Sequence, residues 1–441
     1  MTLDKINQIF KNNKELEPTL KTYYDEFNKS ITYSSDEIFS SEYGFSLGKE
    51  YNLLYTKELR VSSSEFSKLI AKSLGARFGD ESEISDLILE QAHASKKANH
   101  DFDKYLKKFK ENIIKIFNQD IEVYLPNNLV ILDSKITTLK VGSVRILSLI
   151  SLEKETTNII KKMNNPDENI SFNYKHDASK LFLVSGNSES SIPSSKMMWA
   201  VKTYTNKTNA KEEANWKIGV ATSLIRLSSD KWGIHYPRIG TLEPSPTEKS
   251  ELLYTNPLVR NGNNLSAGGR TVQSIYLIDK KISRDLHSGK NQKLFNSVFN
   301  FKPKMLSEQV FNALGWLSKG RGESDRSIKM LYFFTAIEAI LSRGKDSPVK
   351  DTIARHGSVI LAKKIKYRPL IAKQFKNLYD LRSSTIHKGK RSTLAHDVDQ
   401  VQIIAETLIY VILKKCSLQI NHETFCQQLA IASYGTRWPS K

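Results

Sequence analysis

An arginine and a histidine lie five residues apart in the stretch LYDLRSSTIHKGKR, residues 378–391. Arg382 has apolar or aromatic residues about one helical turn away on both sides, and a guanidinium there is costly unless an anion meets it. Arginine offers a fixed charge that fits phosphate oxygens, and histidine exchanges protons near neutral pH. Arg382 and His387 therefore carry the residue types needed to act on a phosphodiester.

A glutamate within the apolar stretch LYFFTAIEAIL is a second unusual residue. Glu338 has Phe334 and Leu341 about one turn away, so its carboxylate needs a partner, and Arg382 is the natural candidate. The alternative is a purely structural pair with an arginine or a tyrosine. The stretch IIAETLIYVIL also carries one glutamate, and we expect both stretches to be buried helices.

Spacing alone does not single out one pair. With 16 arginines and 9 histidines, an Arg followed by a His at this distance is expected about once by chance, and the chain has two such pairs. Arg391 and His396 fall in the polar stretch KGKRSTLAHD, which reads as a solvated loop. Arg382 and His387 end an apolar helix, so we favour them.

The stretch LYFFTAIEAIL, about forty residues of helix, and LYDLRSSTIHKGKR together resemble the HEPN superfamily, and within it the Apea-like HEPN domains. The resemblance covers about residues 303–430. The family motif is an Arg, a polar residue next, and a His four to six residues after the Arg, here Arg382, Ser383 and His387. Family members often have Asn, Asp or His after the Arg, and Ser383 departs from that pattern.

The resemblance implies a metal-independent endoribonuclease with two motifs facing each other across a dimer. Proteins of this kind are often toxin-like effectors of antiphage defence that halt growth of the infected cell. Some HEPN domains only bind or dimerise. A catalytically silent protein that binds nucleic acid or a partner is therefore the alternative.

The chemistry of these residues also indicates RNA as the substrate when the family resemblance is set aside. Its 2′-hydroxyl can attack the adjacent phosphorus with the help of a base, an acid and a cation, and DNA lacks that hydroxyl. We expect no metal and no cofactor, and we expect Lys388, Lys390 and Arg391 to bind the RNA. Five residues of regular helix put His387 roughly 140° round from Arg382. Either the helix loosens at residues 383–385, or two copies pool their residues.

The charge of the chain agrees with a polyanionic partner. The formal net charge is +19, and residues 301–441 alone hold 24 Lys and Arg against 11 Asp and Glu. A generally basic, Lys- and Asn-rich composition is the alternative, but it does not explain the concentration in the last third. With two cysteines, no long apolar run and no signal-like N-terminus, we expect a cytoplasmic protein without a membrane partner.

Two weaker signals concern metals. His422 lies four residues before Cys426, which makes half of a metal site, but no second pair exists, and packing cysteines are favoured. His-Asp dipeptides occur three times and raise a metal-dependent HD phosphohydrolase as a further alternative. The dipeptides are His100–Asp101, His176–Asp177 and His396–Asp397.

The predicted architecture is multidomain α+β in three regions. Residues 1–120 are expected to be mainly helical, and 121–300 to form a mixed α/β domain. This domain and the N-terminal region are assigned to sensing or regulation, with a phage-derived or nucleic-acid trigger as partner. Residues 301–441 are expected to form an all-α, HEPN-like bundle with an N-cap at Asp325. Its predicted helices cover 303–319, 325–343, 348–364, 369–388 and 397–415, with an extension through 422–432.

Overall fold

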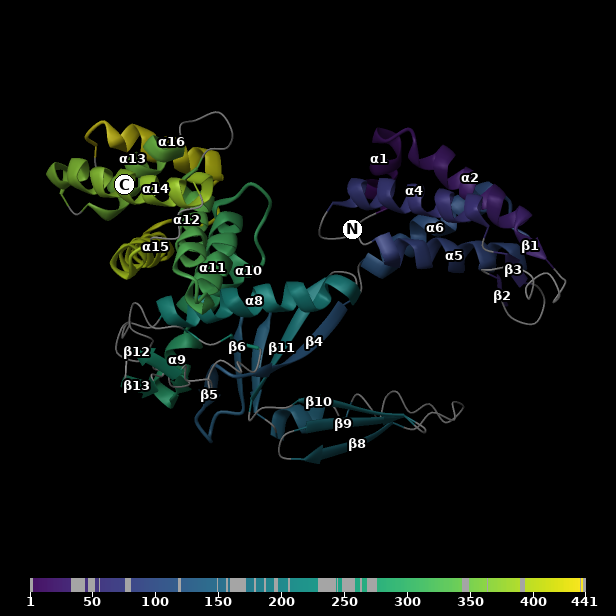
Figure 1. Cartoon of the computed structure of the whole chain (residues 1–441), viewed down its shortest axis with the longest axis horizontal. Helices are drawn as coiled ribbons and strands as arrows, with labels where there is room; N and C mark the ends of the chain where they lie inside the picture. The colour runs from purple at the N-terminus through teal and green to yellow at the C-terminus, as the bar shows by residue number, and fades with distance from the viewer. Residues whose placement is uncertain are drawn as a thin grey trace. The chain divides into compact units, whose positions relative to one another are not determined.

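The computed structural model shows a mostly helical chain with small, mainly antiparallel sheets, in agreement with an α+β class (Figure 1). It forms two compact units, Met1–Val123 with Lys202–Ala214 and Tyr124–Val201 with Asn215–Lys441. The predicted boundary near residue 300 stays a prediction. The described residues are 3–32, 44–46, 52–54, 56–75, 81–117, 120–148, 150–155, 158, 172–177, 180–185, 188–193, 197–204, 207–228, 243, 245–247, 258–261, 264–267, 276–342, 349–362, 364–388, 393–436 and 438.

The first unit is a helical bundle with an aromatic core. Tyr23, Phe27, Phe66, Tyr105 and Phe109 are all buried in it. Three short antiparallel strands that the sequence did not indicate lie alongside. The helices are α1 (Leu3–Asn12), α2 (Leu16–Lys29), α4 (Lys57–Leu74), α5 (Glu81–Lys97) and α6 (Phe102–Phe117), and the strands are β1 (Ile31–Thr32), β2 (Gly44–Ser46) and β3 (Asn52–Leu54).

The strands after residue 120 form several small sheets rather than one large one. The four-stranded sheet has the order β4–β11–β7–β6, with β7 antiparallel to both of its neighbours. A separate parallel pair joins β5 and β14, residues that lie about 145 apart in the chain. The strands are β4 (Asp120–Asn127), β5 (Val130–Leu132), β6 (Thr138–Val141), β7 (Val144–Ser148), β8 (Phe172–Asp177), β9 (Lys180–Ser185), β10 (Ser188–Pro193), β11 (Met197–Tyr204), β12 (Leu258–Asn261), β13 (Asn264–Ala267) and β14 (Tyr276–Ile278).

The part of helix α8 (Lys207–Ser228) that belongs to the second unit lies in its interior, because every residue from Lys217 to Ser228 is buried. It packs closely against α11 (Leu306–Gly322). The Ser223 hydroxyl donates a 2.9 Å hydrogen bond to the carbonyl of Leu314 on α11. A Cβ at Gly315 would lie 2.3 Å from the ring of Trp216, so only glycine permits this contact between the helices.

The C-terminal helices begin and end within a few residues of the predicted ranges. Asp325 caps α12 as expected, because its carboxylate accepts hydrogen bonds from the amides of Ser327 and Ile328. Helix α12 packs against α11, α13, α14 and α15, so it is the centre of the bundle. The helices are α12 (Arg326–Leu341), α13 (Val349–Leu361), α14 (Arg368–Lys388), α15 (Ala395–Lys415) and α16 (His422–Ser433).

Candidate functional site

The predicted pair of Arg382 and Glu338 is present where α14 crosses α12. Arg382 Nη2 donates a 3.3 Å hydrogen bond to Glu338 Oε2 and lies 3.3 Å from Oε1. The two side chains are only 19% and 21% exposed. The guanidinium therefore sits at the surface edge of the bundle, screened from most of the solvent but still accessible.

Tyr379, which lies one turn before Arg382 on α14, completes this arrangement. The guanidinium of Arg382 lies over the ring of Tyr379, 5.3 Å from its centroid. The same ring packs edge-on against Phe334 of α12, with centroids 5.7 Å apart. The signal was available in the sequence, because residues three apart on a helix lie on neighbouring positions of one face.

Burial and hydrogen bonding act in opposite directions on Glu338. Burial raises the pKa of its carboxyl, while the charge of Arg382 and a hydrogen bond from Tyr379 lower it, and the net pKa is above the ordinary value. Burial and the neighbouring Glu338 raise the pKa of the Tyr379 hydroxyl, so this tyrosine acts as a neutral donor. Arg382, Glu338 and Tyr379 thus form one coupled group, called here the Arg382 cluster.

The other predicted site residues lie further along α14. This helix is continuous from Arg368 to Lys388, so it does not loosen at residues 383–385, and the offset of roughly 140° between Arg382 and His387 stands. Ser383 is half-buried on the same helix. The backbones of His387 and Lys388 belong to α14, but their side chains lie outside the described residues, as do Lys390 and Arg391 entirely.

Two histidines outside the predicted site serve the end of α12. His422 donates through Nε2 to the carbonyl of Ile340 (2.7 Å), and His356 donates through Nδ1 to the carbonyl of Leu341 (3.0 Å). Cys426 Sγ lies 3.5 Å from His422 Nε2. The His422–Cys426 pair is therefore built into helix packing, and the described part of the chain shows no group of three or more residues that could hold a metal ion.

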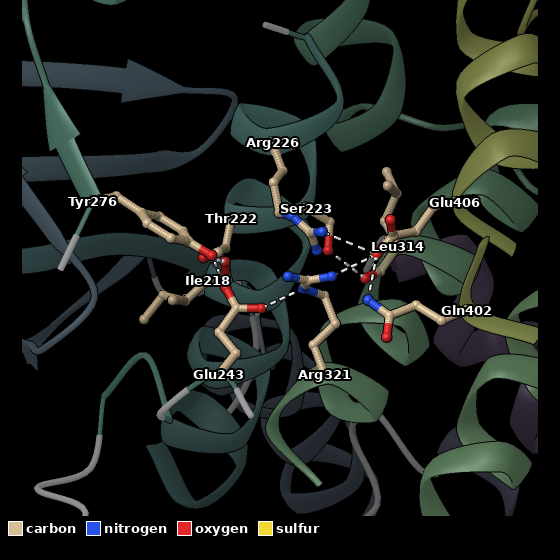
Figure 2. A network of polar contacts seen from close by, with 10 residues as sticks. All are labelled: Ile218, Thr222, Ser223, Arg226, Glu243, Tyr276, Leu314, Arg321, Gln402 and Glu406. Carbon is tan, nitrogen blue, oxygen red and sulfur yellow. Dashed lines mark hydrogen bonds and ion pairs between the residues drawn. The ribbon is translucent and has the colours of Figure 1, made fainter. Parts of the chain in front are cut away.

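A buried ionic network lies in the interior of the second unit (Figure 2). Arg321 of α11 donates to Glu243 through Nε and to Glu406 of α15 through Nη1. Arg226 of α8 reaches the same Glu406 at 3.0 Å, and Tyr276 of β14 donates to Glu243 at 2.6 Å. All these side chains are nearly inaccessible, so the network joins four elements and one loop residue in the interior.

Charge compensation within the network decides the ionisation of its members. Burial alone would lower the pKa of Arg321, but the two carboxylates raise it. Burial would raise the pKa of Glu243, but Arg321 and Arg226 outweigh it and lower that pKa. Two arginines and two glutamates cancel in charge, so this is a structural core rather than a site open to a substrate.

Within the described residues, no helix combines the length and apolar character that a membrane crossing requires. No family model matches the chain, and comparison with curated proteins and with solved structures likewise gives no match.

Proposed function

We propose that the protein is a metal-independent endoribonuclease of HEPN type that acts through Arg382 and His387, in the manner of an antiphage defence effector. The observation that supports this most is the Arg382 cluster itself. A half-screened guanidinium held by Glu338 and Tyr379 lies on the helix that also carries a histidine. The net charge of +19 favours a polyanionic substrate.

The proposed chemistry divides the work between charge and proton transfer. Arg382 neutralises the extra negative charge on the phosphorane oxygens, which form when the 2′-hydroxyl attacks phosphorus. His387 takes the proton of the 2′-hydroxyl or returns a proton to the leaving 5′-oxygen. Attack by the 2′-hydroxyl gives a 2′,3′-cyclic phosphate and a 5′-hydroxyl, and no metal takes part.

The continuous helix supports a site shared between two copies. Because the backbone of α14 stays regular, the positions of Arg382 and His387 lie on different sides of the helix. Two copies with their α14 helices face to face supply the arginine and the histidine together. By the same geometry the position of Ile386 lies on the arc of α14 between Arg382 and His387, so a contact between two copies through this position brings both residues to the shared site.

The assignment of the pair is tested by substitution. Arg382→Ala and His387→Ala are each expected to abolish RNA cleavage and any growth arrest, with the far-ultraviolet circular dichroism of the wild type retained. The matched changes Arg391→Ala and His396→Ala should at most weaken RNA binding through loss of one phosphate contact. Equal losses from the two pairs would refute the assignment.

The reaction is tested through its products. Cleavage should survive EDTA and yield 2′,3′-cyclic phosphate or 2′/3′-phosphate ends together with 5′-hydroxyl ends. RNA with 2′-O-methyl groups throughout should bind but resist cleavage. Products with 5′-phosphate ends, or complete inhibition by EDTA, would instead indicate a metal nuclease.

The shared site is tested by assembly. Ile386→Asp should dissociate the dimer in sedimentation experiments and lower activity, while the monomer stays helical. Tyr379 is unsuitable for this test because its ring packs on Phe334 within one copy. The control is Ile431→Asp, which places the same charge at an exposed apolar position on α16. A monomer with full turnover would exclude the shared site.

A catalytically silent binding protein is the second candidate. It is favoured by the fact that the Arg382 guanidinium is already engaged by Glu338 and Tyr379, as in a structural ion pair. In that case RNA binds without being cut, and the product analysis above distinguishes the two.

A further inference from the structure

We infer that Tyr379 is a positioning residue for Arg382, one that sets both the direction and the freedom of the guanidinium that meets the phosphate. This inference rests on the proposed function and deepens it. The geometry carries it, because the Tyr379 ring lies against the guanidinium of Arg382 and the core ring of Phe334, and its hydroxyl donates a hydrogen bond to the carboxyl of Glu338.

The ring of Tyr379 is held in a fixed position. Phe334 is buried in the centre of the bundle, and Tyr379 meets it edge-on at 88° with centroids 5.7 Å apart, a favoured geometry for aromatic pairs. Phe334 and Glu338 lie one turn apart on α12, so the same helix face supports the ring and the carboxyl. Tyr379 is thus anchored to the core rather than free at the surface.

The fixed ring of Tyr379 in turn constrains the guanidinium of Arg382. A guanidinium 5.3 Å above a ring centroid is attracted to the π-face, and the planar group lies best parallel to it. Glu338 holds only one terminal nitrogen, Nη2, among the hydrogen bonds of the described residues. Glu338 thus fixes one end of the fork, and the ring fixes its plane. The Nε atom of Arg382 is buried, so the N–H groups of Nη1 are the ones left for phosphate oxygens.

The hydroxyl of Tyr379 affects the pH range over which Glu338 stays charged and holds Arg382. The hydrogen bond from Tyr379 lowers the pKa of the Glu338 carboxyl against the effect of burial. Removing the hydroxyl alone should therefore raise this pKa further, so that Glu338 protonates at higher pH and releases Arg382 earlier as the solution becomes acidic. The ring and the hydroxyl have separable effects.

The experiment compares Tyr379→Phe and Tyr379→Leu in the full-length protein on a cleavable RNA. Tyr379→Leu should lower kcat by roughly 10- to 100-fold and raise KM by only a few-fold, since misplacing a catalytic group costs rate more than binding. Tyr379→Phe keeps the ring, so it should lower kcat only a few-fold and move the acidic limb of the kcat–pH profile to higher pH. Equal kcat values and unmoved pH profiles in both variants would overturn the inference.

The matched control is Tyr410 on α15, whose ring lies 5.5 Å from the Lys414 ammonium, the same kind of cation–ring contact on another helix. Tyr410→Leu should leave kcat and the pH profile as in the wild type. If Tyr410→Leu lowers kcat as much as Tyr379→Leu does, the effect is one of stability, and the positioning role is overturned.

Binding of uncleavable 2′-O-methyl RNA separates this inference from the proposed function. If the wild type cuts no RNA, the proposed function fails. If Tyr379 positions Arg382, Tyr379→Leu must even then weaken the binding of 2′-O-methyl RNA. The loss of affinity should be a large part of the loss that Arg382→Ala causes. Unchanged binding in Tyr379→Leu beside weakened binding in Arg382→Ala would exclude the positioning role. If the wild type cuts RNA and Tyr379→Leu cuts it equally fast, the function stands and the inference falls.

Discussion

At the scale of single residues, the half-buried Glu338 and the buried Glu243 respond to pH in opposite senses. Burial raises the pKa of Glu338 above its ordinary value of 4.5, whereas Arg321 and Arg226 lower the pKa of Glu243 below it. The folded protein therefore binds a proton at Glu338 more tightly than the unfolded chain does, and at Glu243 less tightly. The contribution of Glu338 to stability is present at low pH and lost as pH rises through its folded pKa.

The opposite holds for Glu243, whose contribution is present above pH 4.5 and is lost as pH falls through its folded pKa. We predict that Glu338→Gln flattens the pH dependence of the free energy of unfolding above pH 4.5, and that Glu243→Gln flattens it below. Urea unfolding across pH 3–7 measures both. All five tryptophans belong to the second unit, so their fluorescence follows this unit alone. If both substitutions changed the slope of the free energy of unfolding against pH in the same direction, the prediction would be contradicted.

The site was partly accessible from the sequence for a residue-level reason. Glu338 and Arg382 each stand out among apolar neighbours, and a buried charge calls for an opposite one, so their contact was predicted and is confirmed. The role of Tyr379 was not predicted, because an aromatic residue on a half-buried helix looks like ordinary packing. Its role as a platform depends on where Phe334 places the ring, which only the fold reveals.

At the scale of elements, the C-terminal end of α12 is held by its neighbours. The carbonyls in the last turn of a helix lack partners within the helix. Here Ile340 accepts from His422 of α16 and Leu341 accepts from His356 of α13, while the Ser342 amide donates to Glu338. Glu338 belongs to this last turn, so the two histidines also stabilise the backbone that carries it.

We predict that His356→Leu lowers the free energy of unfolding by about 1–3 kcal/mol, because it leaves the buried carbonyl of Leu341 without its donor. The measurement is urea unfolding followed by tryptophan fluorescence. His396→Leu is the matched control. His396 is exposed, and among the hydrogen bonds of the described residues its ring meets only Gln400, so we expect a change within about 0.5 kcal/mol. An equal effect of the two substitutions would contradict the capping role of His356.

Helices with a strong apolar pattern were predicted well, and weakly patterned ones were not. The ranges of α11 to α16 follow from apolar periodicity together with caps such as Asp325. Residues 280–299 were assigned to the mixed domain, yet they form α9 (Lys280–Leu286) and α10 (Gly289–Phe299). Their polar sequence hides the pattern, and the only local signals were the N-caps Asp279 and Ser288.

At the scale of the whole second unit, the buried network joins elements that the sequence gives no reason to connect. Glu406 in IIAETLIYVIL was visible as a charge in an apolar helix, but its partners Arg321 and Arg226 lie 85 and 180 residues away. No local pattern shows which distant arginine meets which glutamate. This part of the fold could not be predicted for that reason.

We predict that Arg321→Met destabilises the second unit by about 3–5 kcal/mol, because it leaves Glu243 and Glu406 buried with one cation fewer. Urea unfolding again provides the measurement. Lys350→Met removes the cation of an exposed pair with Asp380 (2.6 Å) and should cost below about 1 kcal/mol. A loss below about 1 kcal/mol for Arg321→Met would show that the network contributes little.

The long separation of Arg226 from Glu406 also matters while the protein is being made. A ribosome adding about 5–20 residues per second needs roughly ten to forty seconds to extend the chain across those 180 residues. Throughout that interval α8 carries an arginine whose carboxylate has not yet been synthesised, and burying an uncompensated charge is unfavourable. Nascent α8 should therefore stay hydrated and undocked until α15 leaves the exit tunnel, which makes synthesis of the last helices the step that commits the second unit to its fold.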